Sequence, residues 1–349
     1  MRLSETVLIG EFVAALRERL PTSWKLPGRL AVLAGKPIAL RAPNEALATL
    51  SIGVARRLEP KDVAGFVARL REKATRKNVT PIVLAPYLGP RTRELLIESG
   101  AGYWDATGNF RLSLDRPAVF IDVVGASKNP APDSRGLKSL KGPAAGRIVR
   151  ALCDFVPPYG IRELAKRTDT PAPSLSRVID LLDREAVVER KSPRGPIIRV
   201  DWQALIRRWA RDYDFVKSNL TGAYLEPRGL VALPDKLRRA SQLYAVTGTL
   251  AADAVGAAVT APRLATVFVE DMAGVADQLK LRPAESGGNV LIAEPFNSVV
   301  FERTRERESI IYAAPSQVAV DLLTGSGRSP ADGEALLGWM KENEDAWRS

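Results

Sequence analysis

The side chains of this chain that could do chemistry are carboxylates, lysines and tyrosines, because its 349 residues include no histidine and a single cysteine. Serine–histidine or cysteine–histidine catalysis, a histidine-bound metal and an intramolecular disulfide are therefore excluded. The cysteine, Cys153, follows Leu152 in a predicted helix, where a small core side chain is expected. An enzyme built from this sequence would need acidic side chains at the spacing of a metal or acid–base site.

One carboxylate grouping lies in the first third of the chain. Asp105 precedes Asn109-Phe110-Arg111, an order that resembles the Asp and (Asp/Glu)-x-Lys of restriction-endonuclease-like folds. Here asparagine and arginine replace the second carboxylate and the lysine. A neutral amide is a poor ligand for a hard divalent cation, and a guanidinium repels it. We expect Asp105 and Asn109 to shape the Asp-Ala-Thr-Gly-Asn turn instead, with a divergent nuclease as an alternative.

A second grouping lies in the last third. A predicted strand, the turn Thr247-Gly248-Thr249 and a helix precede a strand that ends in Glu270 and Asp271. The order resembles minimal nucleotidyltransferases, in which a glycine turn holds the triphosphate and an Asp-x-Asp pair binds the metal. Adjacent strand residues point to opposite faces, so Glu270 and Asp271 do not form that pair. We predict a degenerate transferase fold with no catalytic residue, metal or cofactor. An active transferase and a small α/β docking domain are the alternatives.

Basic and hydroxyl side chains in the middle of the chain could bind a polyanion. The candidates for DNA contact are Ser174, Ser176, Arg177, Arg190, Lys191, Arg194 and Arg199. The net charge of +11 divides into +8 over residues 1–137, +6 over residues 138–200 and −3 over residues 201–349. Clustered positive charge attracts polyanions, and binding that depends on it weakens steeply with salt.

The elements that must position these candidates have the order of a winged helix-turn-helix over residues 142–200. Apolar spacing predicts a helix at 142–155 and a shorter one at 161–168. After the turn Asp169-Thr-Pro-Ala-Pro173, a third helix capped by Ser174 would present Ser176 and Arg177 to base edges. Strands at 187–191 and 197–200 then predict a hairpin whose basic side chains contact phosphates. A winged helix used for protein contact alone is an alternative.

The flanking segments alternate predicted strands and helices. The first third begins with an amphipathic helix and ends with two strands between residues 102 and 124. In the last third, Asp201 would cap one helix over residues 202–218, with Trp209 among its core residues, and residues 289–303 would form a hairpin.

The predicted fold class is multidomain α/β (α+β), in four parts. They are an N-terminal restriction-endonuclease-like α/β domain at 1–127, a linker at 128–141, the central winged helix at 142–200, and a C-terminal degenerate nucleotidyltransferase-like α/β domain with a helical end at 201–349. The sequence contains no window of about 18 apolar residues, and its start reads as an amphipathic helix rather than a signal peptide. We therefore expect a cytoplasmic, nucleoid-associated protein with no membrane partner.

Several segments resemble a known family. The central winged helix, followed by TGTLAAD, VFVED, SQVAVDLLTGSGR and EALLGWM, is similar to the AbiEi-type antitoxins and transcriptional regulators of type IV toxin-antitoxin systems. The resemblance implies a DNA-binding repressor that acts on its own operon, often beside a nucleotidyltransferase toxin. We therefore expect a non-enzymatic, sequence-specific regulator of double-stranded DNA, with a cognate toxin or a second copy as candidate protein partners. The resemblance maps DNA binding onto Ser174, Ser176, Arg177, Lys191 and Arg194. Many members carry the winged helix at the extreme N-terminus, whereas residues 1–141 precede it here. A nucleic-acid-processing enzyme and a protein-interaction scaffold are the alternatives.

Overall fold

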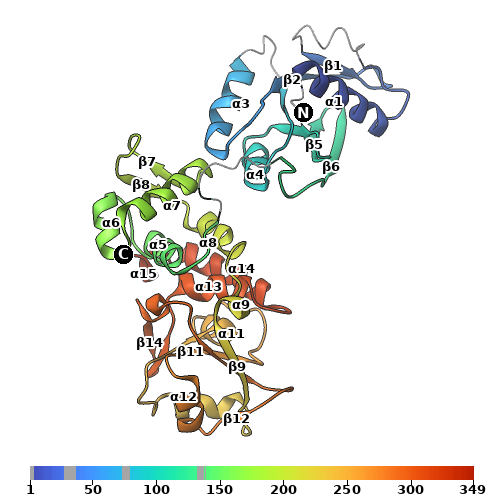
Figure 1. The fold of residues 1–349 in the computed structure, drawn as a ribbon. Coiled ribbons are helices and arrows are strands. Elements are labelled where there is room, and N and C mark those ends of the chain that lie inside the picture. The colour runs from blue at the N-terminus through green and yellow to red at the C-terminus, as the bar shows by residue number, and fades with distance from the viewer. Residues whose placement is uncertain (1–3, 27–36, 73–78, 132–136, 138) are drawn as a thin grey trace. The chain divides into compact units, whose positions relative to one another are not determined.

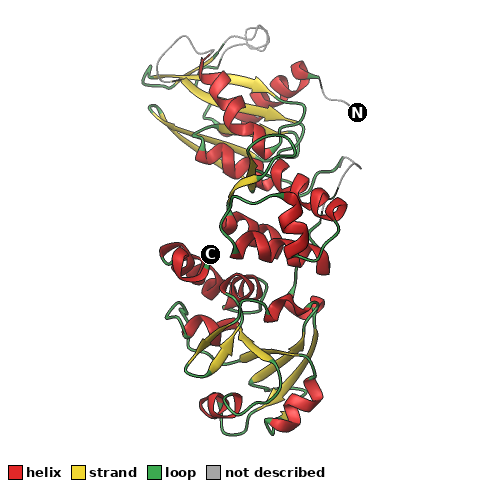
Figure 2. Cartoon of the chain, turned by 90° about the vertical axis from the view of Figure 1, so that its left-hand side faces the viewer, coloured by secondary structure: helices red, strands yellow, loops and turns green. Residues whose placement is uncertain are grey.

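The structure is a computed structural model that describes residues 4–26, 37–72, 79–131, 137 and 139–349. It is a mixed α/β protein with several sheets (Figures 1 and 2), so the predicted mixed class is confirmed. The chain forms two compact units, one of residues 1–135 with 184–186 and one of residues 136–183 with 187–349. No helix in these described ranges has the length and apolar character needed to cross a membrane.

The first unit is built on a six-stranded sheet whose strands lie in chain order. The strands are β1 (Ile38–Arg41), β2 (Leu47–Val54), β3 (Val79–Ala85), β4 (Gly102–Asp105), β5 (Phe110–Asp115) and β6 (Ala118–Val123). The pairs β2–β3 and β3–β4 are parallel and the other pairs are antiparallel. The sequence predicted two strands after residue 101, and this was wrong. Turns at residues 106–109 and 116–117 divide the segment into three.

Helices cover both faces of this sheet. They are α1 (Glu5–Arg19), α3 (Val63–Glu72), which a short 3₁₀ turn precedes, and α4 (Pro90–Glu98). The helix α1 packs its apolar stripe with Leu84, whereas α3 and α4 pack with Val83, the preceding residue of β3. Adjacent strand residues point to opposite faces, so the unit has three layers. The predicted N-terminal amphipathic helix is confirmed.

The second unit begins with the predicted order of three helices and a hairpin. The elements are α5 (Pro143–Asp154), α6 (Ile161–Arg167), α7 (Ala172–Arg184), β7 (Val188–Arg190) and β8 (Ile197–Val200). Tyr159 and Ile197 each donate their backbone N–H to the other's carbonyl, at 3.2 and 3.0 Å, which forms an isolated β-bridge beside the hairpin. Ser174 does not cap the third helix, because α7 already begins at Ala172. Pro173 is tolerated there because the first turn of a helix needs no amide donor.

The rest of the second unit is a seven-stranded sheet in the order β12-β9-β13-β11-β10-β15-β14. Its strands are β9 (Leu220–Leu225), β10 (Tyr244–Thr247), β11 (Ala265–Val269), β12 (Arg282–Pro283), β13 (Val290–Glu294), β14 (Arg305–Arg307) and β15 (Ile310–Tyr312). The hairpin predicted for residues 289–303 is wrong. The strand β13 instead lies between β9 and β11, and the 3₁₀ helix η3 (Ser298–Phe301) follows it.

The helices of this part precede, alternate with and follow the strands of the sheet along the chain. They are α8 (Trp202–Ala210), α9 (Phe215–Ser218), α10 (Leu233–Leu237), which a 3₁₀ turn precedes, α11 (Gly248–Asp253), α12 (Met272–Gln278), α13 (Pro315–Leu323), α14 (Ser329–Glu342) and α15 (Glu344–Trp347). Asp201 caps α8 as predicted, since its Oδ1 accepts from the Ala204 N–H at 3.0 Å. The single helix predicted for residues 202–218 is in fact two, because Asp214 caps a second helix through the Lys217 N–H.

One hydrophobic core runs through the whole second unit, from Leu140 to Trp347. The sequence patterns predict a separate winged-helix domain, a separate C-terminal domain and a linker that extends to residue 141. Leu140 instead is fully buried, and its N–H donates to Asp212 Oδ2 at 2.8 Å. The end of the predicted linker is therefore a packed part of the unit, and the three helices and hairpin share their core with the seven-stranded sheet.

A buried carboxylate, Asp321 on α13, connects three parts of the second unit. Its Oδ1 accepts from Tyr213 Oη at 2.9 Å and from Gln317 Nε2 at 2.8 Å, and its Oδ2 accepts from Thr247 Oγ1 at 2.6 Å. Burial raises the pKa of Asp321 from its ordinary 3.8 to about 7, although the three donors oppose the shift. Between these two values the folded protein holds a proton that the unfolded chain has released, so acid favours the folded state in that window.

We therefore expect Asp321 to make the free energy of unfolding fall as pH rises from about 4 to about 7, by at most about 1.4 kcal/mol per pH unit. Above about pH 7 both states are ionised and this contribution is constant. Urea unfolding at a series of pH values measures the slope. Asp321→Asn should remove this part of the decline, and Asp277→Asn, at an exposed position of α12, should keep it. Equal slopes in wild type and Asp321→Asn would contradict the assignment.

Candidate nucleic-acid interface

The helix α7 presents one apolar and one polar face. Leu175, Val178 and Ile179 are buried in the core, which explains the regular apolar spacing of this segment. Arg177 is exposed on the opposite side, and its Nε donates to the Pro173 carbonyl at 3.3 Å. Ser174 and Ser176 are half-buried. The face predicted from the sequence therefore exists, with Arg177 as its exposed cation.

The turn between α6 and α7 is held by a side chain from α5. Arg147 Nε donates to the Thr168 carbonyl at 2.8 Å, and its Nη2 donates to the Asp169 carbonyl at 3.3 Å. These contacts add donors to carbonyls at the end of α6, where the Thr168 carbonyl also accepts from Thr170 Oγ1 at 2.9 Å. Asp169 itself has a φ of 43°, a left-handed conformation that suits a tight turn. The angle between α6 and α7 is thus fixed by the first helix of the segment.

The tip of the hairpin carries two exposed cations, Lys191 and Arg194. The tip is closed by the Lys191 N–H, which donates to the Pro196 carbonyl at 3.0 Å, and by the Gly195 N–H, which donates to the Ser192 carbonyl at 2.8 Å. Arg194 adopts a φ of 63°, so its side chain leaves the loop from a left-handed residue. Neither side chain has an ion-pair partner among the residues that the structure describes.

Two of the predicted wing contacts are occupied within the protein. The side chain of Arg190 is only 10% exposed, and its Nη2 donates to Asp180 Oδ1 on α7 at 2.8 Å. The expectation that Arg190 is an exposed wing residue is therefore wrong, because it fastens the hairpin to α7. Arg199 stays exposed, but its Nε donates to Glu189 Oε2 across the hairpin at 2.9 Å. Its positive charge is compensated by a neighbouring carboxylate.

The helix α6 adds cations that the candidate set left out. Arg162 and Lys166 are exposed on this helix, while Arg167 pairs with Glu163 and lies over the ring of Phe155. The sequence gives no reason to select Arg162 and Lys166, because a short charged helix is common on protein surfaces. The exposed cations without a carboxylate partner in the described part of this segment are Arg162, Lys166, Arg177, Lys191 and Arg194.

The carboxylates Asp105 and Asp271 of the two predicted groupings accept hydrogen bonds that shape a turn and cap a helix. Asp105 is fully buried, and it accepts from the N–H groups of Leu88, Thr107 and Asn109. Asn109 is also buried, and its Nδ2 donates to Asp105 Oδ2 at 2.9 Å. The predicted turn role of both residues is confirmed. In the last third, Asp271 caps α12 through the Gly274 N–H at 3.0 Å. Within the described residues, no three or more acidic or cysteine side chains gather where they could hold a metal ion.

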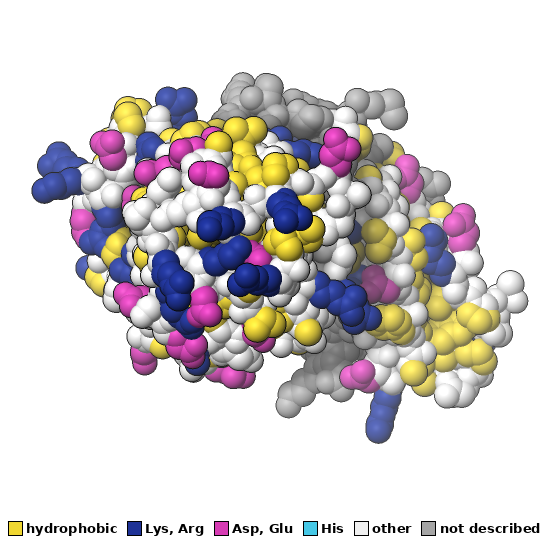
Figure 3. Space-filling model, turned by 90° about the horizontal axis from the view of Figure 1, so that it is seen from below, with side chains coloured by type: hydrophobic (Ala, Val, Ile, Leu, Met, Phe, Trp, Pro, Cys, Tyr) yellow, Lys and Arg dark blue, Asp and Glu magenta, His cyan; other side chains and the backbone are white. Residues whose placement is uncertain are grey.

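The surface of the molecule carries both signs of charge. Figure 3 shows Lys and Arg side chains interspersed with Asp, Glu and apolar side chains on the face that it presents. This face provides no single-sign field, and polyanion binding therefore depends on particular residues elsewhere in the structure. The exposed cations of α6, α7 and the hairpin are such residues, because three consecutive elements present them.

Comparison with known proteins finds no matching family model, no matching curated protein and no matching solved structure.

Proposed function

We propose that this chain is a sequence-specific, double-stranded DNA-binding transcriptional regulator, and that residues 142–200 are its winged helix-turn-helix. The observation that carries the proposal is the order α5, α6, α7 and hairpin, with Arg177, Lys191 and Arg194 exposed on the last two elements. In such modules the last helix enters the major groove. The hairpin contacts the phosphate backbone, which positions the helix without reading sequence.

Each exposed side chain has a proposed part in this mechanism. Arg177 donates to the O6 and N7 atoms of a guanine, the commonest specific contact in a major groove. Ser174 and Ser176 contact phosphate or base edges at the start of α7. Lys191 and Arg194 bind phosphates, and Arg162 and Lys166 add backbone contacts from α6. Arg190 acts indirectly, because its ion pair with Asp180 holds the hairpin against α7.

Regulation of its own operon, association with the nucleoid and a cognate toxin partner belong to the same proposal. The resemblance of the segments after residue 243 to AbiEi-type regulators supports them. A single winged helix reads only a short half-site, so a homodimer on an inverted repeat fits the proposal. Asp105 is engaged in turn contacts and Asp271 in a helix cap, so their carboxylates are less available as metal ligands of a nuclease or a transferase.

A gel-shift titration tests the proposal. The purified protein is titrated against its own upstream region and against a random duplex of equal length, at about 150 mM salt with competitor DNA. We expect at least about a hundredfold preference for the upstream region, as a lower bound, since specific regulators typically prefer their site by about 10³–10⁷. Equal affinity for both duplexes would overturn sequence-specific regulation and favour an architectural or enzymatic role. Absence of binding to both would favour a protein-interaction scaffold.

The wing makes a separate prediction. Arg194→Gln should weaken binding to specific and random duplexes by similar factors, because a phosphate contact carries no sequence information. It should also reduce the slope of log affinity against log salt by about one. Fluorescence anisotropy titrations at four salt concentrations measure both effects. Lys341→Gln, at an exposed position of α14, is the matched control. A loss confined to the specific duplex would contradict the phosphate assignment.

A further inference from the structure

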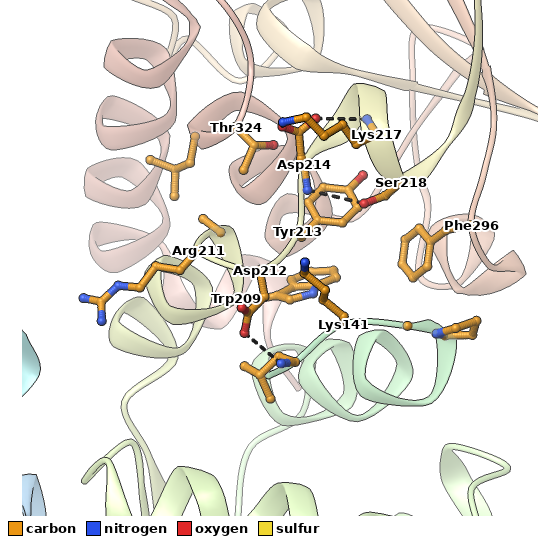
Figure 4. Close-up of a pocket in the computed structure, with 15 residues that line it drawn as sticks. Lys141, Trp209, Arg211, Asp212, Tyr213, Asp214, Lys217, Ser218, Phe296 and Thr324 are labelled. Carbon is orange, nitrogen blue, oxygen red and sulfur yellow. Dashed lines mark hydrogen bonds and ion pairs between the residues drawn. The ribbon is translucent and has the colours of Figure 1, made fainter. Parts of the chain in front are cut away.

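A cavity of about 680 Å³ opens in the second unit (Figure 4). Its walls come from residues 140–143 before α5, from residues 209–214 at the end of α8, from α9, and from Phe296 and the end of α13. The volume lies within the range of about 300–1,000 Å³ that is typical of small-molecule sites. The segment 140–143 leads directly into the first helix of the proposed DNA-binding module, so the cavity adjoins that module.

One wall of the cavity is aromatic. The ring centroids of Trp209 and Tyr213 lie 5.1 Å apart, and the Phe296 ring lies 5.5 Å from Tyr213 and 6.4 Å from Trp209. Trp209 and Tyr213 are almost fully buried, whereas Phe296 is half-buried and offers ring surface to the cavity. The wall is rigid, because Tyr213 Oη is also bonded to Asp321 and Asn219. Such a surface favours a flat, apolar ligand group.

The charges around the cavity favour an anion. Asp212 Oδ2 accepts from the Leu140 N–H at 2.8 Å and from Arg208 Nη1 at 2.6 Å. Asp214 Oδ2 accepts from Lys217 Nζ at 2.8 Å. Both carboxylates are thus compensated by cations of the protein.

Two more cations line the cavity: Arg211, whose guanidinium points away from it in Figure 4, and Lys141. The Lys141 side chain is exposed and points from the segment before α5 into the cavity in Figure 4. Its ammonium has no hydrogen-bond or ion-pair partner within the described ranges of the chain. An ammonium beside an aromatic wall fits a carboxylate on a flat ring, because the anion gains a charge-assisted hydrogen bond while the ring stays on apolar surface.

We propose that this cavity binds a small aromatic carboxylate, with its ring against Phe296 and its carboxylate on Lys141 Nζ. Neutral rings lack the ionic contact, and aromatic cations meet Lys141 as a like charge. The site is independent of the proposed function, since its ligand is recognised without DNA.

Packing would transmit ligand binding to α5. Gly146 lies so close to Phe296 that a Cβ at this position would be 2.6 Å from the ring atom Cε2. A change in the position of the Phe296 ring therefore presses directly on α5. An effect of the ligand on DNA affinity rests on the proposed function, and it is measured separately from binding.

Isothermal titration calorimetry of the full chain with 2-naphthoate tests the site. Its neutral and cationic counterparts, 2-naphthamide and 2-naphthylmethylammonium, have the same ring. We expect one naphthoate per chain, bound at least about tenfold more tightly than the amide, as a charge-assisted hydrogen bond would give. Lys141→Gln should remove the preference for the anion, Phe296→Ala should weaken naphthoate and amide alike, and Lys341→Gln should behave as wild type.

The result that would overturn the site is a titration with no saturable naphthoate binding. Equal affinities for naphthoate and amide, or unchanged naphthoate affinity in Lys141→Gln, would overturn the anion contact. Unfolding curves of each variant verify that it is folded, and Lys141→Arg, which keeps the charge, should retain the preference for the anion. Because no DNA is present, naphthoate binding together with a failed gel shift would refute the proposed function and leave the ligand site standing.

Discussion

Replacing Arg177 by alanine is expected to lower the affinity for the specific DNA site by about 1–3 kcal/mol, with little change on random DNA. Arg177 is the exposed cation of α7, and the contact of its Nε with the Pro173 carbonyl leaves the terminal nitrogens of the guanidinium available for a base. A bidentate contact to guanine depends on those two donors. Competition gel shifts with duplexes changed at one base pair at a time should show relaxed preference at a single position.

Two further variants separate this effect from a general loss of charge. Arg177→Lys keeps the charge but lacks the planar fork, so it should lose base preference while retaining affinity for random DNA. Arg239→Ala removes an exposed arginine that follows α10 and should bind like wild type. If Arg177→Ala weakens specific and random duplexes by the same factor, then Arg177 binds phosphate and α7 does not read bases through it.

Local patterns made the central segment the most predictable part of the chain. The spacing of Ile148 and Leu152 on α5, and of Leu175, Val178 and Ile179 on α7, follows directly from burial on one helical face. The prolines and Gly160 between the helices mark the breaks, and the short strands alternate around a Ser-Pro-Arg-Gly-Pro tip. These signals act within a few residues, so one sequence suffices to find them.

Long-range contacts could not be predicted in this way. Nothing in the sequence marks Leu140 as a core residue rather than a linker residue, since its burial depends on elements that include α8, far along the chain. The pairing of β13 with β9 and β11 likewise joins segments separated by many residues, whereas a hairpin is the default for neighbouring apolar runs. The merging of the winged segment with the seven-stranded sheet is a consequence of such contacts.

The candidate site was predictable in its residue types but not in their pairing. Arg190 and Arg194 look alike as basic residues of one hairpin, yet Arg190 meets Asp180 of α7 and Arg194 meets no carboxylate in the described structure. Which arginine is paired depends on how the hairpin packs against the helix, and a count of charges does not contain that information. The cavity beside Lys141 was missed for the same reason, because its walls come from segments that lie far apart in the chain.

The largest effect on stability is expected at Arg150, which is fully buried on α5 and joins it to two other elements. Its Nε and Nη2 donate to Asp154 Oδ2 at 3.1 and 2.9 Å, and its Nη1 donates to the Val299 carbonyl at 3.0 Å and to Gln317 Oε1 at 3.2 Å. Arg150→Ala would leave the Asp154 carboxylate buried without its cation. Removing one partner of a buried ion pair costs about 3–5 kcal/mol, and we expect a loss of that size in the free energy of unfolding.

Urea denaturation followed by circular dichroism measures this loss. Arg207→Ala is the matched control, because Arg207 pairs with Glu334 at an exposed position, where an ion pair contributes about 0–1 kcal/mol. The double variant Arg150→Met with Asp154→Asn should recover part of the loss, since it removes the uncompensated charge together with its partner. A loss for Arg150→Ala no larger than for Arg207→Ala would mean that α5 is held by apolar packing alone. In that case the sheet of the second unit would not depend on this ion pair for its attachment to the three helices.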